Sequence, residues 1–234
     1  MAGLYDVLRV GLARPLCVML FRPKVRRMDL IPTEGAVILA GNHLGTGESF
    51  LIPAYLRRPV AWTAKKELFQ LRGPWGWFCR HFLHFIRAVP IDRAGGLEAK
   101  AGAIHSAETV LAEGGVVGIS PEGTRSPDGR LYKFHTGVAR FALDSGAPVV
   151  PYACFNTRFR PGWLPFPWLY GPEVVFGPPI HVDPELARAY REAPDREAAR
   201  LVLRQVADSL RDVVASMTGQ TYVDEYASKR KRLS

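Results

Sequence analysis

Cysteine is scarce in this 234-residue chain, and its three cysteines stand far apart at positions 17, 79 and 154. No C-x-x-C pair occurs, and an odd number of dispersed cysteines is typical of reduced thiols in a cytoplasmic protein. Cys79, His81 and His84 lie close together, but within the aromatic run "WGWFCRHFLHFIRAV" and without a second ligand cluster. This context favours a packed amphipathic segment over a metal site.

Long apolar runs are also missing. The apolar stretch 4–21 is interrupted by three charged residues and Pro15, and its longest unbroken piece, "PLCVMLF", is far shorter than the ~20 residues of a membrane-spanning helix. Pro15 is expected to divide it into two short helices, and the basic stretch "RPKVRR" (22–27) follows. Such a hairpin suits insertion into one leaflet of an anionic membrane. The alternative is a helix packed on the protein's own core, followed by an exposed basic loop.

Acidic residues are too few to balance the basic ones. The 31 Lys and Arg against 22 Asp and Glu give a net charge of +9, which indicates an anionic partner: nucleic acid, a membrane surface or a phosphorylated substrate. No nucleic-acid-reading module is recognisable, and the aromatic residues are interleaved with apolar rather than basic ones, which argues against nucleic acid.

Short apolar runs alternate with amphipathic stretches, which predicts an α/β fold. Because no internal repeat or long linker occurs, we expect one domain. The predicted strands are 36–42, 58–65, 84–92, 116–120, 148–155 and 172–182. The predicted helices are 97–113, 136–146, one that begins at Asp183-Pro184, and 195–217.

Several catalytic signatures are absent. There is no G-x-x-x-x-G-K-[ST] and no H-E-x-x-H, and Phe50 stands where a dinucleotide fingerprint beginning at Gly45 needs its third glycine. "GISPEG" (118–123) fails as a nucleophile elbow, because Glu122 replaces the last glycine and Pro121 has no N–H for an oxyanion hole.

The stretch "AGNHLGTGESF" (40–50) places a glutamate five residues after a histidine. His43 can act as a general base toward a hydroxyl if a carboxylate fixes its tautomer and stabilises the imidazolium. On a regular helix this offset would set the two side chains about 140° apart. A pair of His43 with Glu48 therefore needs a turn, for which Gly45 and Gly47 offer the freedom. The alternative is a surface histidine beside a helix-capping glutamate.

Basic side chains follow several of the predicted strands. Strand ends converge in an α/β domain, and arginine binds phosphate through two parallel hydrogen bonds, so these residues could meet one anion. Each could equally be a solvated loop charge. They are Lys65, Lys66, Arg93, Arg125, Arg130 and Lys133.

Taken together and in order, these blocks resemble the motifs of the glycerolipid acyltransferase family, typified by 1-acyl-sn-glycerol-3-phosphate acyltransferases. Asn42-His43 and the four residues that follow are similar to N-H-x-x-x-x-D, with Glu48 in place of the aspartate. "KKEL" (65–68) and "IDR" (91–93) resemble the second region, 122–126 is an intact E-G-T-R-S, and "APVVPYA" (147–153) resembles the fourth motif. Four ordered motifs, within roughly residues 30–180, are far more specific than any one alone.

The resemblance implies a single acyltransferase domain over residues 30–220, with a mixed central sheet flanked by helices. A short membrane-associating helical hairpin in residues 1–29 would precede it, and a basic tail, 221–234, would follow. The implied reaction belongs to phospholipid biosynthesis. A fatty acyl group passes from acyl-CoA or acyl-carrier protein to the free hydroxyl of 1-acyl-sn-glycerol 3-phosphate, giving phosphatidic acid. The protein would be peripheral or monotopic on the cytoplasmic face of the cell membrane, and no cofactor or metal is implied.

The resemblance also assigns roles to residues. His43 would be the general base, assisted by Glu48. A second group of residues would bind the acceptor phosphate, and Glu122 in this group would help to order the loop. The side chain of Glu48 is longer than that of the aspartate in the motif. Either the His43–Glu48 pair is rearranged to keep the hydrogen bond, or the enzyme uses a different acceptor, such as another lysolipid or a glycolipid. A non-catalytic lipid-binding protein is a further alternative, but a binder needs no base. The expected phosphate-binding group is Lys65, Arg93, Glu122, Gly123, Thr124 and Arg125.

Overall fold

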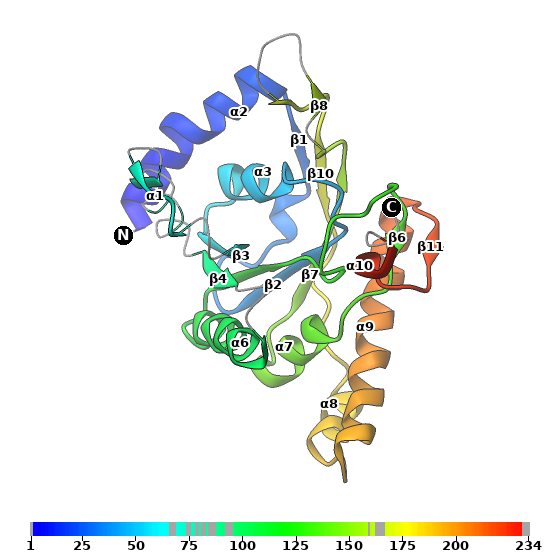
Figure 1. Cartoon of the computed structure of the whole chain (residues 1–234). Helices are drawn as coiled ribbons and strands as arrows, with labels where there is room; N and C mark the ends of the chain where they lie inside the picture. Colours follow the sequence, from blue (N-terminus) through cyan, green and yellow to red (C-terminus); the bar gives the residue numbers. More distant parts are fainter. Residues whose placement is uncertain are drawn as a thin grey trace.

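The computed structural model describes residues 2–65, 69–73, 76–77, 80, 83, 88–91, 96–158, 160–161 and 167–230. At its centre lies a seven-stranded sheet with the order β1-β10-β7-β2-β5-β3-β4 (Figure 1). The strands from β7 to β4 are mutually parallel, β10 is antiparallel to β7, and β1 is parallel to β10. The mixed sheet predicted from the sequence is confirmed. Its strands are β1 (Lys24–Arg26), β2 (Val37–Gly41), β3 (Val60–Lys65), β4 (Val89–Ile91), β5 (Val116–Ile119), β7 (Val149–Phe155) and β10 (Glu173–Phe176).

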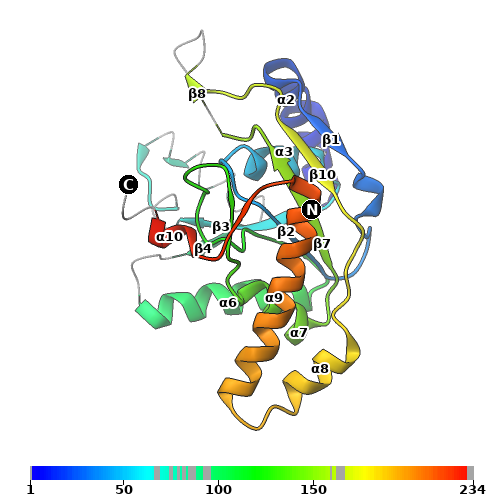
Figure 2. The ribbon, with the colours of Figure 1, turned by 90° about the vertical axis from the view of Figure 1, so that its right-hand side faces the viewer.

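Helices cover both faces of this sheet (Figures 1 and 2). Helices α6 (Gly96–Ala112), α7 (Gly137–Ser145) and α9 (Arg196–Thr218) pack on one face, and α3 (Glu48–Tyr55) packs on the other. Alternate side chains of a strand point to opposite faces, so Ile38 of β2 enters the first core and Leu39 enters the second. Burial on both faces explains why the central strands read as continuous apolar runs.

The predicted helix ends are also confirmed. The Asp183 carboxylate accepts a hydrogen bond from the N–H of Glu185 (2.7 Å) at the start of α8 (Pro184–Arg191). Asp195 caps α9 in the same way, and Gly146 ends α7 with a φ of 66°. The expected strand over 84–92 is seen as β4; residues 84–87 and 92 lie outside the described residues.

The N-terminal residues form one continuous helical run instead of the predicted hairpin. Helix α1 (Ala2–Leu8) passes through a π-helical turn, η1 (Arg9–Ala13), into α2 (Arg14–Phe21). The N–H of Arg14 bonds to the carbonyl of Arg9, five residues back. The hydrogen-bond ladder has thus widened before Pro15, whose ring would clash with a carbonyl four residues back. The proline is accommodated and does not break the helix.

One side of this run is docked on the end of α3, where backbone carbonyls lack helical partners. The Tyr5 hydroxyl donates to the carbonyl of Pro53 (2.8 Å), and Arg9 donates to that of Tyr55 (3.3 Å). None of the described helices has the length and apolar character needed to cross a membrane. The run also carries large apolar side chains exposed to solvent: Val7, Leu8, Val10, Leu12, Leu16, Val18 and Met19.

Both predicted ends of the domain differ from the structure. Strand β1 lies in the segment assigned to the N-terminal hairpin but extends the central sheet. Within the expected basic tail, residues 222–230 are folded onto the domain: β11 (Tyr222–Val223) pairs with β6 (Leu131–Tyr132), and Ala227 of α10 (Ala227–Arg230) is buried. Two-residue strands are too short for a readable pattern, and their partners are distant in the chain. The described chain also contains η2 (Met28–Leu30) and the pair β8 (Arg160–Pro161) and β9 (Pro167–Trp168).

Candidate active site

The candidate site lies where β2 and β5 end. These strands are parallel neighbours, so the loops that follow them leave the same edge of the sheet. We call residues 42–47 the first loop and residues 120–130 the second loop. His43 lies in the first, and Glu122 and Arg125 lie in the second.

The structure brings His43 and Glu48 together. The ring Nδ1 of His43 lies 2.5 Å from Oε1 of Glu48, the first residue of α3, whose side chain is fully buried. In the tautomer that donates a hydrogen bond from Nδ1 to this carboxylate, Nε2 of the neutral ring keeps its lone pair. Nε2 has no hydrogen-bond partner among the described residues, and the His43 side chain is 13% exposed. The longer glutamate thus reaches the ring directly.

The two glycines of the first loop serve close packing, a role that differs from the expected conformational freedom. Gly47 has an ordinary right-handed backbone (φ −59°), and neither glycine has a positive φ. A Cβ on Gly45 would collide with the carbonyl of Thr157, and one on Gly47 would lie 2.7 Å from the same oxygen. The N–H of Gly47 donates to that carbonyl (3.0 Å). The turn therefore lies directly against the backbone that follows β7.

Asn42 anchors the start of the first loop. Its fully buried amide accepts a hydrogen bond from the N–H of Cys154 (2.7 Å) and donates to the carbonyl of the same residue (3.0 Å). It also donates to the side-chain oxygen of Gln220 (2.9 Å). These contacts fix the backbone from which His43 projects.

Glu122 joins the second loop to the first. Its carboxylate is buried and accepts one hydrogen bond from the N–H of His43 (2.8 Å) and one from the N–H of Tyr132 (3.0 Å). Burial raises the pKa of Glu122 to about 7; the two N–H donors oppose this rise, and the charge of Glu48 adds to it. Both carboxylate oxygens bond to the backbone, a placement that suits the ordering of the loop.

Further hydrogen bonds order the second loop. The N–H of Ser126 donates to the carbonyl of His43 (2.8 Å), and the Ser126 hydroxyl donates to the carbonyl of Arg130 (2.8 Å). Gly123 has a φ of 72°, and a Cβ there would lie 2.8 Å from the ring of His135, so this position requires glycine. Thr124, beside it, is half-buried.

The basic residues of the expected anion site differ in what they contact. Arg130 makes two hydrogen bonds to the Asp128 carboxylate (2.6 and 2.8 Å), and Lys133 forms an ion pair with Asp224 (2.9 Å). Arg125 is exposed, and its guanidinium has no hydrogen bond or ion pair with any described residue. Of these three cations, Arg125 is the one available to an anionic ligand.

The remaining basic candidates follow adjacent strands. Lys65 ends β3 and pairs with Ile91 at the end of β4. The side chain of Lys65, together with Lys66 and Arg93, lies outside the described residues. The same holds for Cys79, His81 and His84; among the described residues, no group of three or more His, Cys, Asp or Glu could hold a metal ion.

Sequence reasoning missed two residues that join the loops. The Arg158 guanidinium donates to the carbonyl of Ser126 (2.6 Å) and to that of Leu44 (3.4 Å), and so bridges the second loop and the first. Arg158 follows β7, the other neighbour of β2, so its place after a strand was a usable signal. Gln220, which bonds to Asn42, follows a helix and carries no such signal.

One strand-end loop thus carries a histidine held by a buried carboxylate, and the neighbouring loop carries an arginine without a described partner; these are the residue types of a candidate general base and a candidate anion ligand. A family model described as "Acyltransferase" matches residues 22–155, more than half of the chain. The chain belongs to this family of acyltransferase enzymes.

Named relatives agree with this assignment. Over 180 residues the chain is 32% identical to a 1-acyl-sn-glycerol-3-phosphate acyltransferase of Pseudomonas aeruginosa, covering 76% of this chain and 66% of the relative. An enzyme of the same name from Bacillus subtilis is 31% identical over 164 residues (68% and 73%), and one from Borreliella burgdorferi is 31% identical over 128 (55% and 49%). The match thus spans just under two thirds of the first relative and about half of the last.

A solved structure shares the fold. The 1-acyl-sn-glycerophosphate acyltransferase PlsC of Thermotoga maritima superposes with a TM-score of 0.58 at 20% identity, covering 92% of this chain and 80% of that one.

Proposed function

We propose that the protein is a membrane-associated acyltransferase that moves a fatty acyl group from acyl-CoA or acyl-carrier protein to the free hydroxyl of 1-acyl-sn-glycerol 3-phosphate, giving phosphatidic acid. The observation that carries this proposal is the contact between His43 and Glu48, held against the E-G-T-R-S loop by Glu122. The names of the relatives support the choice of acceptor.

In the proposed reaction, Nε2 of His43 takes the proton of the acceptor hydroxyl while its oxygen attacks the thioester carbonyl. The Glu48 carboxylate stabilises the imidazolium that forms. When the tetrahedral intermediate collapses, the C–S bond breaks, the new ester remains, and the imidazolium returns the proton to the leaving thiolate. His43 ends the cycle neutral, so no further co-reactant is needed.

The acceptor phosphate is assigned to Arg125. Its planar guanidinium can make two parallel hydrogen bonds to phosphate, and it has no competing carboxylate, unlike Arg130 and Lys133. Lys65 and Arg93 remain in the proposed site because Lys65 ends β3 and Arg93 comes two residues after β4 in the sequence. Both strands lie on the same side of β2 as β5, which the second loop follows.

We place the protein on the cytoplasmic face of the membrane, with the N-terminal helical run in one leaflet. One side of the run packs on α3, while its exposed apolar side chains have the character of an interfacial helix. The exposed Arg22, Lys24 and Arg27 follow it and suit anionic headgroups.

The membrane test must keep β1, since deleting residues 1–27 would also remove an edge strand of the sheet. A Leu12→Asp/Met19→Asp variant alters only exposed positions. We expect this variant to remain in the supernatant when anionic vesicles are sedimented, whereas the wild type should sediment with the vesicles. Leu201→Asp, on α9 and equally exposed, is the matched control. Undiminished sedimentation of the double variant would contradict the assignment.

The decisive assay offers labelled acyl-CoA or acyl-carrier protein to the full-length protein with a panel of acceptors: 1-acyl-sn-glycerol 3-phosphate, neutral lysolipids and glycolipids. We expect the phosphorylated acceptor to be preferred and turnover to be lost in His43→Ala. A preference for another lysolipid or a glycolipid would overturn the acceptor assignment. It would also explain why Glu48 stands in place of the motif's aspartate. Binding without turnover would favour a non-catalytic lipid-binding protein.

A further inference from the structure

The segment Gly219–Tyr226, here called the strap, lies against the far end of the second loop. Gly219 ends α9 with a φ of 64°, and the chain then runs alongside β6. The N–H of Leu131 donates to the carbonyl of Thr221 (3.1 Å), and that of Lys133 donates to the carbonyl of Glu225 (3.0 Å). The second loop is therefore held by β5 at its start and by the strap at its end.

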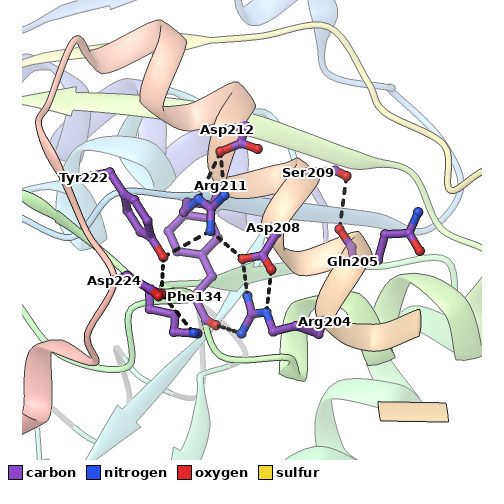
Figure 3. A network of polar contacts seen from close by, with 10 residues as sticks. Phe134, Arg204, Gln205, Asp208, Ser209, Arg211, Asp212, Tyr222 and Asp224 are labelled. Atoms are coloured by element: carbon purple, nitrogen blue, oxygen red, sulfur yellow. Dashed lines mark hydrogen bonds and ion pairs between the residues drawn. The ribbon is translucent and has the colours of Figure 1, made fainter. Parts of the chain in front are cut away.

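Side chains fix the strap to α9 (Figure 3). Arg211 donates to the Tyr222 hydroxyl (3.1 Å), and its guanidinium lies 4.2 Å from the centre of the Tyr222 ring. The Tyr222 hydroxyl donates in turn to Asp224 (2.8 Å), which also pairs with Lys133. Arg204, two turns earlier in α9, donates to the carbonyl of Phe134 (2.7 Å). The strap is thus an ordered part of the domain.

Gln220 links the strap to both loops of the site. Its side-chain oxygen accepts a hydrogen bond from the buried amide of Asn42 (2.9 Å), which immediately precedes His43. Its side-chain nitrogen donates to the carbonyl of Gly129 in the second loop. One amide therefore spans the loop of the candidate base and the loop of the candidate phosphate ligand.

We infer that Gln220 is a positioning residue that keeps these two loops in register during acyl transfer. The inference rests on the proposed function. His43 must meet the hydroxyl of a molecule whose phosphate is held by Arg125, so the spacing of the loops sets the angle of attack. A misplacement of about 1 Å in such a geometry can cost a factor of about 100.

Two substitutions separate the two contacts. Gln220→Met keeps the length of the side chain but loses both hydrogen bonds, and we expect kcat to fall about tenfold and the acceptor KM to rise. Gln220→Glu keeps an acceptor for Asn42 but loses the donor to Gly129. We therefore expect near-normal kcat with a raised acceptor KM. Gln205→Met is the matched control, since Gln205 lies on the exposed side of α9, away from the strap (Figure 3).

A second measurement does not depend on activity. The N–H of Ser126 bonds to the carbonyl of His43 between the loops, so amide hydrogen exchange in residues 120–130 should be several-fold faster in Gln220→Met than in Gln205→Met. An inactive wild type would refute the proposed function, while the exchange data would still test the strap. The inference is overturned if exchange is unchanged, or if kcat and KM of both Gln220 variants stay within twofold of the control.

Discussion

The site contains two buried glutamates with different roles: Glu48, the first residue of α3 directly after the first loop, and Glu122, in the second loop. Glu48 bonds to a side chain, the ring of His43, whereas Glu122 bonds to two backbone N–H groups. A carboxylate beside an imidazole stabilises the protonated form of the ring. A carboxylate that accepts hydrogen bonds from backbone N–H groups instead fixes the conformation of the chain. The first loop therefore carries the candidate catalytic base, and the second loop is a frame, meaning a segment whose fixed conformation positions Arg125.

The largest expected effect comes from the first loop. His43→Ala removes the base and should lower kcat by roughly 10²–10⁴-fold, the usual contribution of a positioned general base. Steady-state kinetics with the phosphorylated acceptor measure this, and circular dichroism checks that the fold is kept. Near-normal turnover in a folded variant would show that the loop does not supply the base.

Glu48 tests whether the charge or only the shape of that carboxylate matters. Glu48→Gln keeps the size but loses the charge, and we expect kcat to fall about 10- to 100-fold because the imidazolium is less stabilised. Glu48→Asp should also lose activity, since the turn is built around the longer side chain that reaches Nδ1 of His43. If Gln is as active as Glu, Glu48 is a capping residue and His43 works without it.

Arg125 tests the second loop as a ligand. Arg125→Ala should raise the acceptor KM about tenfold or more with a smaller change in kcat. Arg125→Lys should keep only part of the affinity, because a lysine cannot make the proposed bidentate contact with phosphate. Arg130→Ala is the control, since Arg130 already pairs with Asp128. An equal rise in KM for both variants would mean that charge near the loop, and not Arg125 itself, holds the acceptor.

Glu122 tests the second loop as a frame, and its effect is measured on stability and not on turnover. Its pKa is raised to about 7, so the folded protein holds a proton between pH 4.5 and 7 that the unfolded chain releases. The free energy of unfolding should therefore fall as pH rises through this window, by on the order of 3 kcal/mol, and level off above it. Urea denaturation should show this slope in the wild type but not in Glu122→Gln. Parallel pH profiles would assign the slope to another group.

Much of the architecture could be read from local sequence. Apolar runs marked β2, β5 and β7, and Asp183, Asp195 and Gly146 marked helix ends, because these signals act within a few residues. The approach of His43 to Glu48 was anticipated but not its cause. The glycines pack against Thr157, a contact more than a hundred residues away along the chain.

Local signals failed where a distant partner decides the outcome. Pro15 predicted a helix break, but a π-helical turn and docking on α3 keep the N-terminal run continuous. Lys133 and Arg125 look alike in the sequence, and only folding brings Asp224, 91 residues away, to Lys133.

By itself, the sequence determined which residue types follow each strand and, through four ordered motifs, the family. Tertiary structure alone decided which of those side chains remain free, and that Gln220 joins the loops of His43 and Arg125. The physical reason is that a motif records the order of residues along the chain. A hydrogen bond between loops depends on where strands pair, and that pairing is set by the whole core.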